Sequence, residues 1–413
     1  MDAREQRGLE IANRSQIMKE GKAWLVPSQS SNETYTVVDD PAFARCSCPD
    51  FELRGKTCKH IHAVRYTIER ILNPDGSTTV TETVTIAKRT TYKQNWPAYN
   101  EAQTTEKDRF QILLRDLCAG IQEPPQENGR PRIPFRDAVF AAAFKVFSTV
   151  SGRRFSCDMR DAHAKGYVSR LPHYNSIFSY LENPQLTTIL RGLIVESSKP
   201  LKSLETNFAV DSSGFCTSRF ERWFDVKYGR ETTRREWVKV HLMCGVTTNV
   251  VTSVEIADKF AADSPMLGPL VRTTARNFKI AEVSADKGYL SKDNLDIVDT
   301  VGGRAYIPYK EGVNLGERPT ELWARMYYFY QFNRETFLKH YHRRSNVEST
   351  FSMIKAKFGD SVRSKTDVAQ TNEALCKILC HNICCLIQSQ CELGIEATFW
   401  AESSPAQKPE LLA

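Results

Sequence analysis

The sequence contains no uninterrupted apolar run of the length that a membrane helix needs, so we expect no transmembrane segment. Its N-terminal stretch, MDAREQRGLEIANRSQ, is charged and lacks an apolar core, so we expect no secretory signal. A large excess of one charge is also absent, because 56 basic and 49 acidic residues give a net charge of +7. This mild excess favours polyanionic partners without identifying them.

Cysteine, by contrast, is abundant. The 413 residues include 12 cysteines, and in the absence of a secretory signal these predict reduced thiols or metal ligands rather than disulfides. Cys376, Cys380 and Cys384 recur at every fourth position of an apolar helical run, where free cysteine acts as a small hydrophobic residue. An apolar content of 41% indicates a folded chain, and the length allows two or three domains.

The stretch CSCPDFELRGKTCKH groups four potential metal ligands as C-x-C-x9-C-x-H: Cys46, Cys48, Cys58 and His60. Three thiolates and one imidazole form a closed tetrahedral zinc site, which predicts a structural rather than a catalytic metal. His62 lies four residues after Cys58 and is the alternative ligand if His60 points away. The region resembles the SWIM zinc finger, and the resemblance, which covers about the first seventy residues, implies a small module that binds DNA or protein.

The middle of the chain changes its apolar period. From Phe135 to about Leu201 apolar residues recur at helical spacing, and Asn183-Pro184 is a typical helix start. Basic residues between these short predicted helices favour a DNA-binding module, although a structural helical bundle fits the same pattern. After Lys202 the period becomes two, and strands then alternate with helices, which predicts an α/β domain with a mixed sheet.

Three carboxylates stand out in this α/β region. Asp211 ends the strand-like run NFAVD, Asp286 ends the run IAEVSAD, and Glu348 follows on a predicted helix. An isolated aspartate at a strand end is usually a turn residue. Three carboxylates that converge repel one another unless cations neutralise them, and oxygen ligands of this kind suit Mg²⁺ or Mn²⁺. Two such ions can catalyse an in-line phosphoryl displacement.

The helix that carries Glu348 has the sequence YHRRSNVESTFSMIK. Two helical turns place Glu348 and Lys355 on one face, with Tyr341 and Arg344 close to it if the helix runs through them. The alternative is a capping box, in which Ser345 caps the helix and Glu348 bonds back to the cap amide.

At these residues the chain resembles the DDE transposases of the bacterial insertion-sequence type. The matching marks are FAVDSSGF, VSADKGY and the signature Y-x2-R-x3-E-x6-K. The resemblance covers roughly residues 135–390 and implies an RNase H-like fold, an α/β domain whose mixed β-sheet is flanked by helices. The segment between Asp286 and Glu348 is too short for the large β-rich insertion that some members carry.

The resemblance assigns roles to the signature residues. It implies that Asp211, Asp286 and Glu348 are catalytic and hold Mg²⁺ or Mn²⁺. It also implies that Tyr341, Arg344 and Lys355 contact DNA phosphates.

The function that we expect is a DNA transposase, which cleaves the ends of an insertion sequence and transfers the strands into target DNA. A nuclease that cuts without joining and a catalytically silent DNA-binding protein are the alternatives. Double-stranded DNA is the expected partner, with a possible homodimer on paired DNA ends, in the bacterial cytoplasm at the nucleoid. The predicted organisation is a zinc finger (1–72), a linker region (73–134), a helical DNA-binding region (135–201), a catalytic domain (202–392) and a C-terminal tail (393–413).

Overall fold

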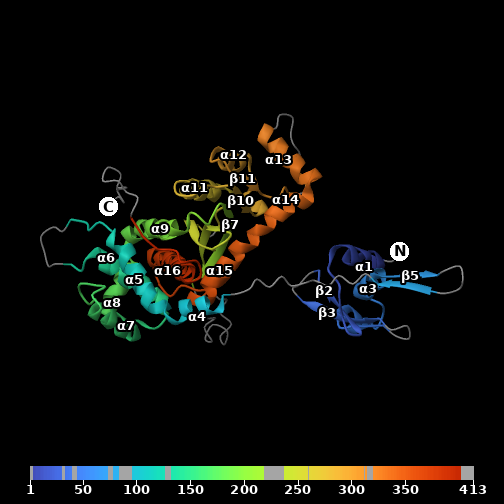
Figure 1. Cartoon of the computed structure of the whole chain (residues 1–413), viewed down its shortest axis with the longest axis horizontal. Coiled ribbons are helices and arrows are strands. Elements are labelled where there is room, and N and C mark those ends of the chain that lie inside the picture. The colour runs from blue at the N-terminus through green and yellow to red at the C-terminus, as the bar shows by residue number, and fades with distance from the viewer. Residues whose placement is uncertain are drawn as a thin grey trace, which may run out of the picture. The chain divides into compact units, whose positions relative to one another are not determined.

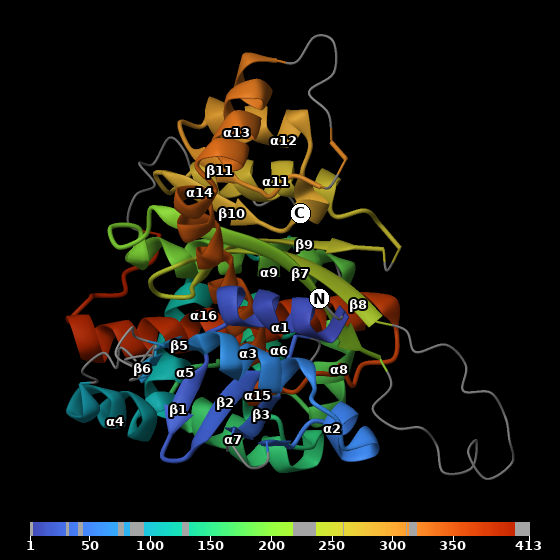
Figure 2. The same cartoon turned by 90° about the vertical axis from the view of Figure 1, so that its right-hand side faces the viewer.

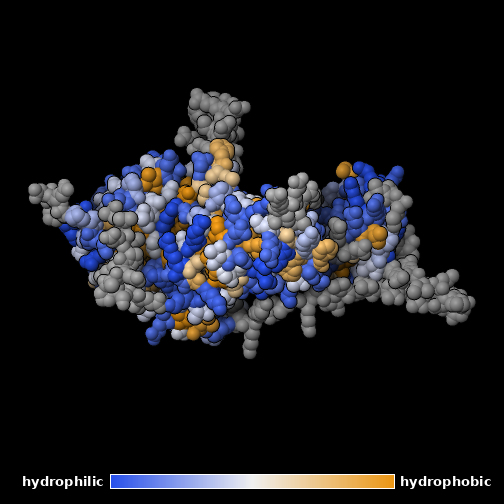
Figure 3. Space-filling view, turned by 90° about the horizontal axis from the view of Figure 1, so that it is seen from above, coloured by the Kyte–Doolittle hydropathy of each residue, from blue (hydrophilic) through white to orange (hydrophobic). Residues whose placement is uncertain are grey.

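The computed structural model divides the chain into two compact units, Met1–Lys93 and Gln94–Ala413 (Figure 1). It describes residues 3–29, 33–39, 44–72, 78–82, 95–125, 132–217, 237–258, 260–310, 312–313 and 320–400. No helix in these ranges is long and apolar enough to cross a membrane. On the face seen in Figure 3, hydrophilic residues predominate and apolar side chains form small separate groups.

The first unit is a small sheet covered by helices. Its four strands pair antiparallel in the order β1-β2-β3-β4, and a hairpin follows the last helix. A Cβ atom at Gly8 would lie 2.5 Å from the Cβ of His62, so the close approach of the first helix to the third requires glycine. The elements are α1 (Ala3–Arg14), β1 (Met18–Glu20), β2 (Ala23–Pro27), β3 (Thr34–Asp39), β4 (Ala44–Cys46), α2 (Pro49–Arg54), α3 (Lys59–Thr67), β5 (Ile68–Leu72) and β6 (Thr78–Glu82).

The second unit is built around a five-stranded mixed sheet with the order β11-β10-β7-β8-β9. The central strand β7 pairs antiparallel with β8 and parallel with β10, and β10 pairs parallel with β11. This mixed sheet, flanked by helices, confirms the fold predicted from the sequence. The strands are β7 (Asn207–Cys216), β8 (Trp237–Gly245), β9 (Val251–Ala257), β10 (Glu282–Ala285) and β11 (Arg304–Tyr306).

Each face of this sheet packs against its own set of helices, because alternate side chains of a strand point to opposite faces. Phe208, Val210 and Met243 pack into one apolar cluster with the helices above the sheet in Figure 2. Ala209 and Leu242 belong to a larger cluster on the other face. The first set consists of α11 (Ser264–Ala275), α12 (Lys292–Thr300), α13 (Glu321–Phe332) and α14 (Arg334–Tyr341).

The larger cluster centres on the 27-residue helix α16 (Asp367–Leu393). Cys376 and Cys380 are fully buried in it and Cys384 is partly buried, which confirms their packing as small hydrophobic residues. Asn183 caps one of the surrounding helices through Gln185 N at 3.0 Å, as the sequence predicted. The surrounding helices are α4 (Trp96–Thr104), α5 (Glu106–Ala119), α6 (Phe135–Ser148), α7 (Gly152–Ala164), α8 (Tyr174–Leu181), α9 (Pro184–Ser198) and α15 (Ser345–Phe358).

The structure differs from the predicted organisation before residue 135. We predicted a linker region at residues 73–134, yet α4 and α5 lie there and join the apolar cluster around α16. Phe110, Leu114 and Leu117 of α5 are fully buried, and their helical spacing is the signal that the prediction missed. The helices of residues 135–201 share this same core with the sheet, so they do not form a separate body.

Candidate active site and metal centre

The four predicted zinc ligands meet in the first unit. Cys46 ends β4, Cys48 precedes α2, and Cys58 and His60 lie at the start of α3. Their ligand atoms all lie within 4.8 Å of one another, and all four residues are buried. A tetrahedral site with Zn–S bonds of about 2.3 Å separates neighbouring ligands by about 3.8 Å, so this donor set fits zinc.

His60 rather than His62 belongs to this cluster. The Nδ1 atom of His60 lies 3.8 Å from the Cys46 sulfur and 3.9 Å from the Cys58 sulfur. His62 is half-buried and its Cβ faces Gly8 of α1. The position of His60 therefore supports it as the fourth zinc ligand.

The buried thiols share their protons unequally. The hydrogen bond from the Cys46 thiol lowers the pKa of Cys58 to about 3, and that same bond, followed by burial, raises the pKa of Cys46. A thiolate is the form of cysteine that binds metal. Cys58 is therefore the thiolate of the cluster before metal binds. Zinc binding would release the protons of the Cys46 and Cys48 thiols.

The two aspartates of the second unit lie on adjacent parallel strands. Asp211 is in β7, and Asp286 directly follows β10, where it precedes the 3₁₀ turn Lys287–Tyr289. Ala285 is in register with Val210, so the next residues along the two strands are Asp286 and Asp211. Neighbouring strands are about 4.8 Å apart, which brings the two carboxylates to the same point of the sheet.

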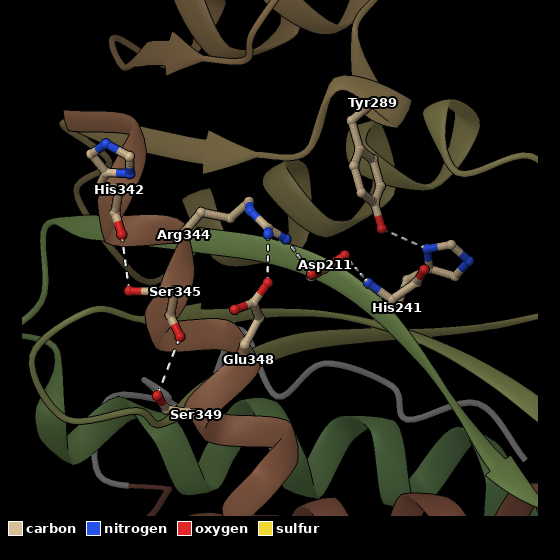
Figure 4. A network of polar contacts seen from close by, with 9 residues as sticks. Asp211, His241, Tyr289, His342, Arg344, Ser345, Glu348 and Ser349 are labelled. Atoms are coloured by element: carbon tan, nitrogen blue, oxygen red, sulfur yellow. Dashed lines mark hydrogen bonds and ion pairs between the residues drawn. The ribbon is translucent and has the colours of Figure 1, made fainter. Parts of the chain in front are cut away.

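Glu348 lies on α15, which packs against β7, and Arg344 connects it to Asp211 (Figure 4). The Arg344 guanidinium donates to Asp211 Oδ2 at 2.6 Å and to Glu348 Oε1 at 2.5 Å. Asp211 also accepts the backbone N–H of Ser212 at 2.8 Å. One guanidinium thus joins a carboxylate of the sheet to a carboxylate of the helix.

The pKa values of Asp211 and Arg344 reflect the charged groups that surround them. Burial raises the pKa of Asp211, the Ser212 amide and Arg344 lower it, and the charges of Asp286 and Glu348 raise it further. Burial opposes the charge of Arg344, but the surrounding carboxylates outweigh it and raise the pKa of the guanidinium. Three carboxylates around one guanidinium leave an excess of negative charge that further cations would neutralise.

The oxygen donor set of Asp211, Asp286 and Glu348 suits a hard divalent cation such as Mg²⁺. In the described part of the chain, however, their oxygens do not gather within 4.8 Å of one another as the zinc-finger ligands do. The guanidinium of Arg344 lies between them instead. The residues fit a metal, provided that Arg344 gives up its carboxylate contacts when the metal binds.

The remaining signature residues lie near Arg344 and β7. Tyr341, at the end of α14, is half-buried, and its ring centre lies 6.0 Å from the Arg344 guanidinium. Lys355 donates to Ser213 Oγ at 2.7 Å, two residues beyond Asp211, and burial lowers its pKa. The residues of the Y-x2-R-x3-E-x6-K signature therefore lie along β7, the strand that carries Asp211.

The capping box is not what the structure contains. The residue before α15 is Arg344, which has helical dihedral angles and makes no side-chain cap. The 3₁₀ turn His342–Arg344 joins α14 to α15, so the helical path runs through Tyr341 and Arg344. Ser345 Oγ donates back to the His342 carbonyl at 2.9 Å (Figure 4), and Glu348 pairs with Arg344.

Sequence reasoning missed a buried pair beside this site. His241 of β8 is fully buried, and its Nδ1 lies 2.8 Å from the hydroxyl of Tyr289 (Figure 4). Burial lowers the pKa of His241 to about 4, so its imidazole is neutral at pH 7. The available signal was a histidine inside the apolar run VKVHLMCGV.

Two parts of the chain match known protein families. Residues 202–383 match the transposase DDE domain, and residues 31–68 match the SWIM zinc finger. The first range contains Asp211, Asp286 and Glu348, and the second contains the four clustered cysteine and histidine ligands. No curated protein matches the chain.

Proposed function

We propose that this chain, which carries a transposase DDE domain and a SWIM zinc finger, is a DNA transposase that cleaves the ends of a mobile DNA segment and joins them to target DNA. The observation that carries the proposal is the register of β7 and β10, which aligns Asp211 with Asp286, while Arg344 connects Glu348 to the same point. Such an arrangement is suited to charge developing on a phosphodiester.

Asp211, Asp286 and Glu348 would hold one or two Mg²⁺ or Mn²⁺ ions. When bound, such ions lower the pKa of water and stabilise the charge on the attacked phosphate. Tyr341 and Lys355 flank the carboxylates along α14 and α15 and would orient the phosphate backbone. Arg344 is placed to exchange its contact with a carboxylate for one with a phosphate.

The chemistry consists of two exchanges at phosphorus. In the first, a water oxygen bonds to phosphorus and the 3′ oxygen of the DNA strand leaves. In the second, the freed 3′-hydroxyl attacks a target phosphodiester and displaces another oxygen. Each step forms one P–O bond and breaks one, so neither an oxidant nor a covalent enzyme intermediate is needed.

The partner would be double-stranded DNA, in the form of element ends and target. By resemblance to transposases of this type, we also propose that two copies assemble on paired ends. By the same resemblance we propose a location in the bacterial cytoplasm, at the nucleoid.

The test uses the full chain, Mn²⁺ and a duplex that carries the DNA flanking the reading frame. We expect cuts at the element boundary, followed by joining of pre-cleaved ends to a target plasmid. Glu348→Gln should abolish both activities, whereas Glu335→Gln, at an exposed position of α14, should leave them intact. Cutting without joining would support the nuclease alternative, and binding without cutting would support the silent DNA-binding protein.

A further inference from the structure

A second basic site lies apart from the three carboxylates. A cavity of about 80 Å³ opens between α6, α8 and the segment that joins α15 to α16. Lys145, Arg363 and Lys377 line it, together with one carboxylate, Glu373. One water needs only about 10–15 Å³ of such space, so the cavity can hold a larger polar group.

Lys145 is the unusual member of this lining. Its side chain comes from the last turn of α6, and the residue is only 8% exposed. Among the described residues its ammonium donates to no acceptor, and it lies 6.0 Å from the centre of the Phe155 ring. Burial first, and the Arg363 charge second, lower the pKa of Lys145, and the charge of Glu373 opposes them. The side chain lines the cavity, and an anion bound there would offset the free-energy cost of burying most of this cation.

The other charged groups of the cavity already form hydrogen bonds within the protein. Lys377 donates to the carbonyls of Phe358, Gly359 and Ser361 at 2.7–2.9 Å, and so caps the end of α15. Glu373 accepts the backbone N–H groups of Arg363 and Ser364 at 2.8–2.9 Å and the Ser364 hydroxyl at 2.7 Å.

Arg363 donates to Thr149 O through Nη1 at 2.7 Å and is exposed. Three cations face one fully occupied carboxylate, so the cavity has a net positive charge.

The segment that carries Arg363 is fastened to the strand of the candidate active site. Cys216, at the end of β7, exchanges backbone hydrogen bonds with Asp360 and Val362 at 2.9–3.0 Å. Cys216 lies five residues beyond Asp211 along an extended strand, which corresponds to about 17 Å at 3.3–3.4 Å per residue. B-form DNA rises about 3.4 Å per base pair, so this distance spans about five base pairs.

We propose that Lys145 and Arg363 bind a phosphate of the DNA backbone about five or more nucleotides from the phosphate that is cut. This assignment rests on the proposed function, because it takes DNA to be the substrate that lies across β7. Lys355, which contacts Ser213 between the two sites, lies on the same path. The contact would fix the position of the DNA relative to the carboxylates, since phosphate contacts set register rather than sequence preference.

The test measures how the affinity for duplex DNA depends on salt concentration. It uses the full chain with the substitution Asp286→Asn, so that the DNA stays uncut. Lys145→Met, which keeps the apolar stem, should lower the slope of log K against log salt by about 0.9, the value for one phosphate. Arg363→Gln should do the same. Lys279→Met removes an equal charge at an exposed position outside the cavity and should leave the slope unchanged.

Ethylation of DNA phosphates locates the contact. A phosphate about five or more nucleotides from the cut should interfere with binding by the parent chain and not by Lys145→Met. The proposal would be overturned if Lys145→Met and Arg363→Gln bound DNA with the same salt slope as Lys279→Met. It would also be overturned if the two cavity variants changed the melting temperature of the protein without changing that slope. Loss of inorganic phosphate binding with an unchanged DNA slope would mean that the cavity holds a free anion, which also overturns it.

This experiment and the test of the proposed function fail separately. A lowered slope in a protein that never cuts DNA would support the phosphate contact and contradict the transposase. If the protein cuts and joins DNA but the salt slope of binding does not depend on Lys145, the transposase function is supported and the proposed phosphate contact is contradicted.

Discussion

Arg344 donates to the carboxylate of Asp211 at 2.6 Å, and the two residues come from a 3₁₀ turn and a strand that are far apart in the chain. The same guanidinium binds Glu348 at 2.5 Å. Arg344 therefore neutralises part of the charge that divalent cations would otherwise neutralise, and it competes with them for the same oxygens.

Replacing Arg344 should make the second unit depend on metal. Arg344→Gln leaves three carboxylates without their guanidinium, and charge-assisted hydrogen bonds of this kind contribute about 1.5–3 kcal/mol. Because the pair is partly exposed, we expect a loss of about 1–2 kcal/mol without metal, most of which Mn²⁺ should restore. Thermal unfolding with and without Mn²⁺ measures this. Arg343→Gln, which breaks only an ion pair with Glu282 at 2.7 Å, is the matched control, and equal Mn²⁺ effects on both variants would contradict the competition.

Asp286→Asn should abolish DNA cleavage and leave DNA binding intact. The substitution keeps the shape of the side chain and removes the charge that would hold a metal. We expect a loss of activity of about 10³-fold or more, because metal-ion catalysis contributes several kcal/mol to the barrier. Cleavage with Mn²⁺ and a gel-shift assay measure the two properties. Asp293→Asn, at an exposed position of α12, serves as the control, and retained cutting by Asp286→Asn would remove Asp286 from the metal site.

Cys58→Ser should release zinc and unfold the first unit, because the metal supplies much of the folding free energy of such a small domain. Metal analysis should find about one zinc per chain before the substitution and none after it, and limited proteolysis should then digest the first seventy residues. Cys157→Ser, at an exposed cysteine of α7, should retain the metal. His60→Ala should lose zinc and His62→Ala should keep it; the opposite result would assign His62 as the ligand.

His381 should make the protein less stable in mild acid. Burial lowers the pKa of His381 to about 4, from an ordinary value of 6.5, although its Nε2 lies 2.9 Å from the Asn249 carbonyl. The unfolded chain therefore binds a proton near pH 5–6 that the folded chain does not. Stability from this group is complete above about pH 6.5 and is lost as the pH falls to 4, by roughly 3 kcal/mol.

The check for His381 is denaturant unfolding at pH 7, 5.5 and 4.5. His381→Gln keeps a donor for the Asn249 carbonyl but cannot titrate, so the variant should lose less stability between pH 7 and 4.5 than the parent chain. Part of the loss should remain because burial also lowers the pKa of His241 to about 4. Identical pH profiles for the variant and the parent would refute the role of His381.

Local patterns in the sequence were enough for part of this description. The spacing of Cys46, Cys48, Cys58 and His60 indicated a metal cluster, and the alternation of apolar residues indicated the strands of the sheet. Asn183-Pro184 predicted a helix start that the structure contains. The helix signature around Glu348 indicated a transposase domain, which the family comparison supports. Each of these features depends on residues within a few turns or strand positions of one another.

Other features depended on which segments meet. The helical spacing of Phe110, Leu114 and Leu117 was visible in the sequence, but only the shared core around α16 placed α4 and α5 inside the second unit. The choice between His60 and His62 followed from the packing of α3 on α1. Ser345 could have capped a helix by its sequence, and the continuous path from α14 to α15 decided against it.

The sequence by itself determined the residue types of the candidate site and the elements that carry them. The tertiary structure alone decided that Asp286 aligns with Asp211 and that Arg344 lies between Asp211 and Glu348. The physical reason is that periodicity and capping arise from neighbours along the chain. Strand order and register, in contrast, are set by the burial of both faces of the sheet, to which residues across the whole domain contribute.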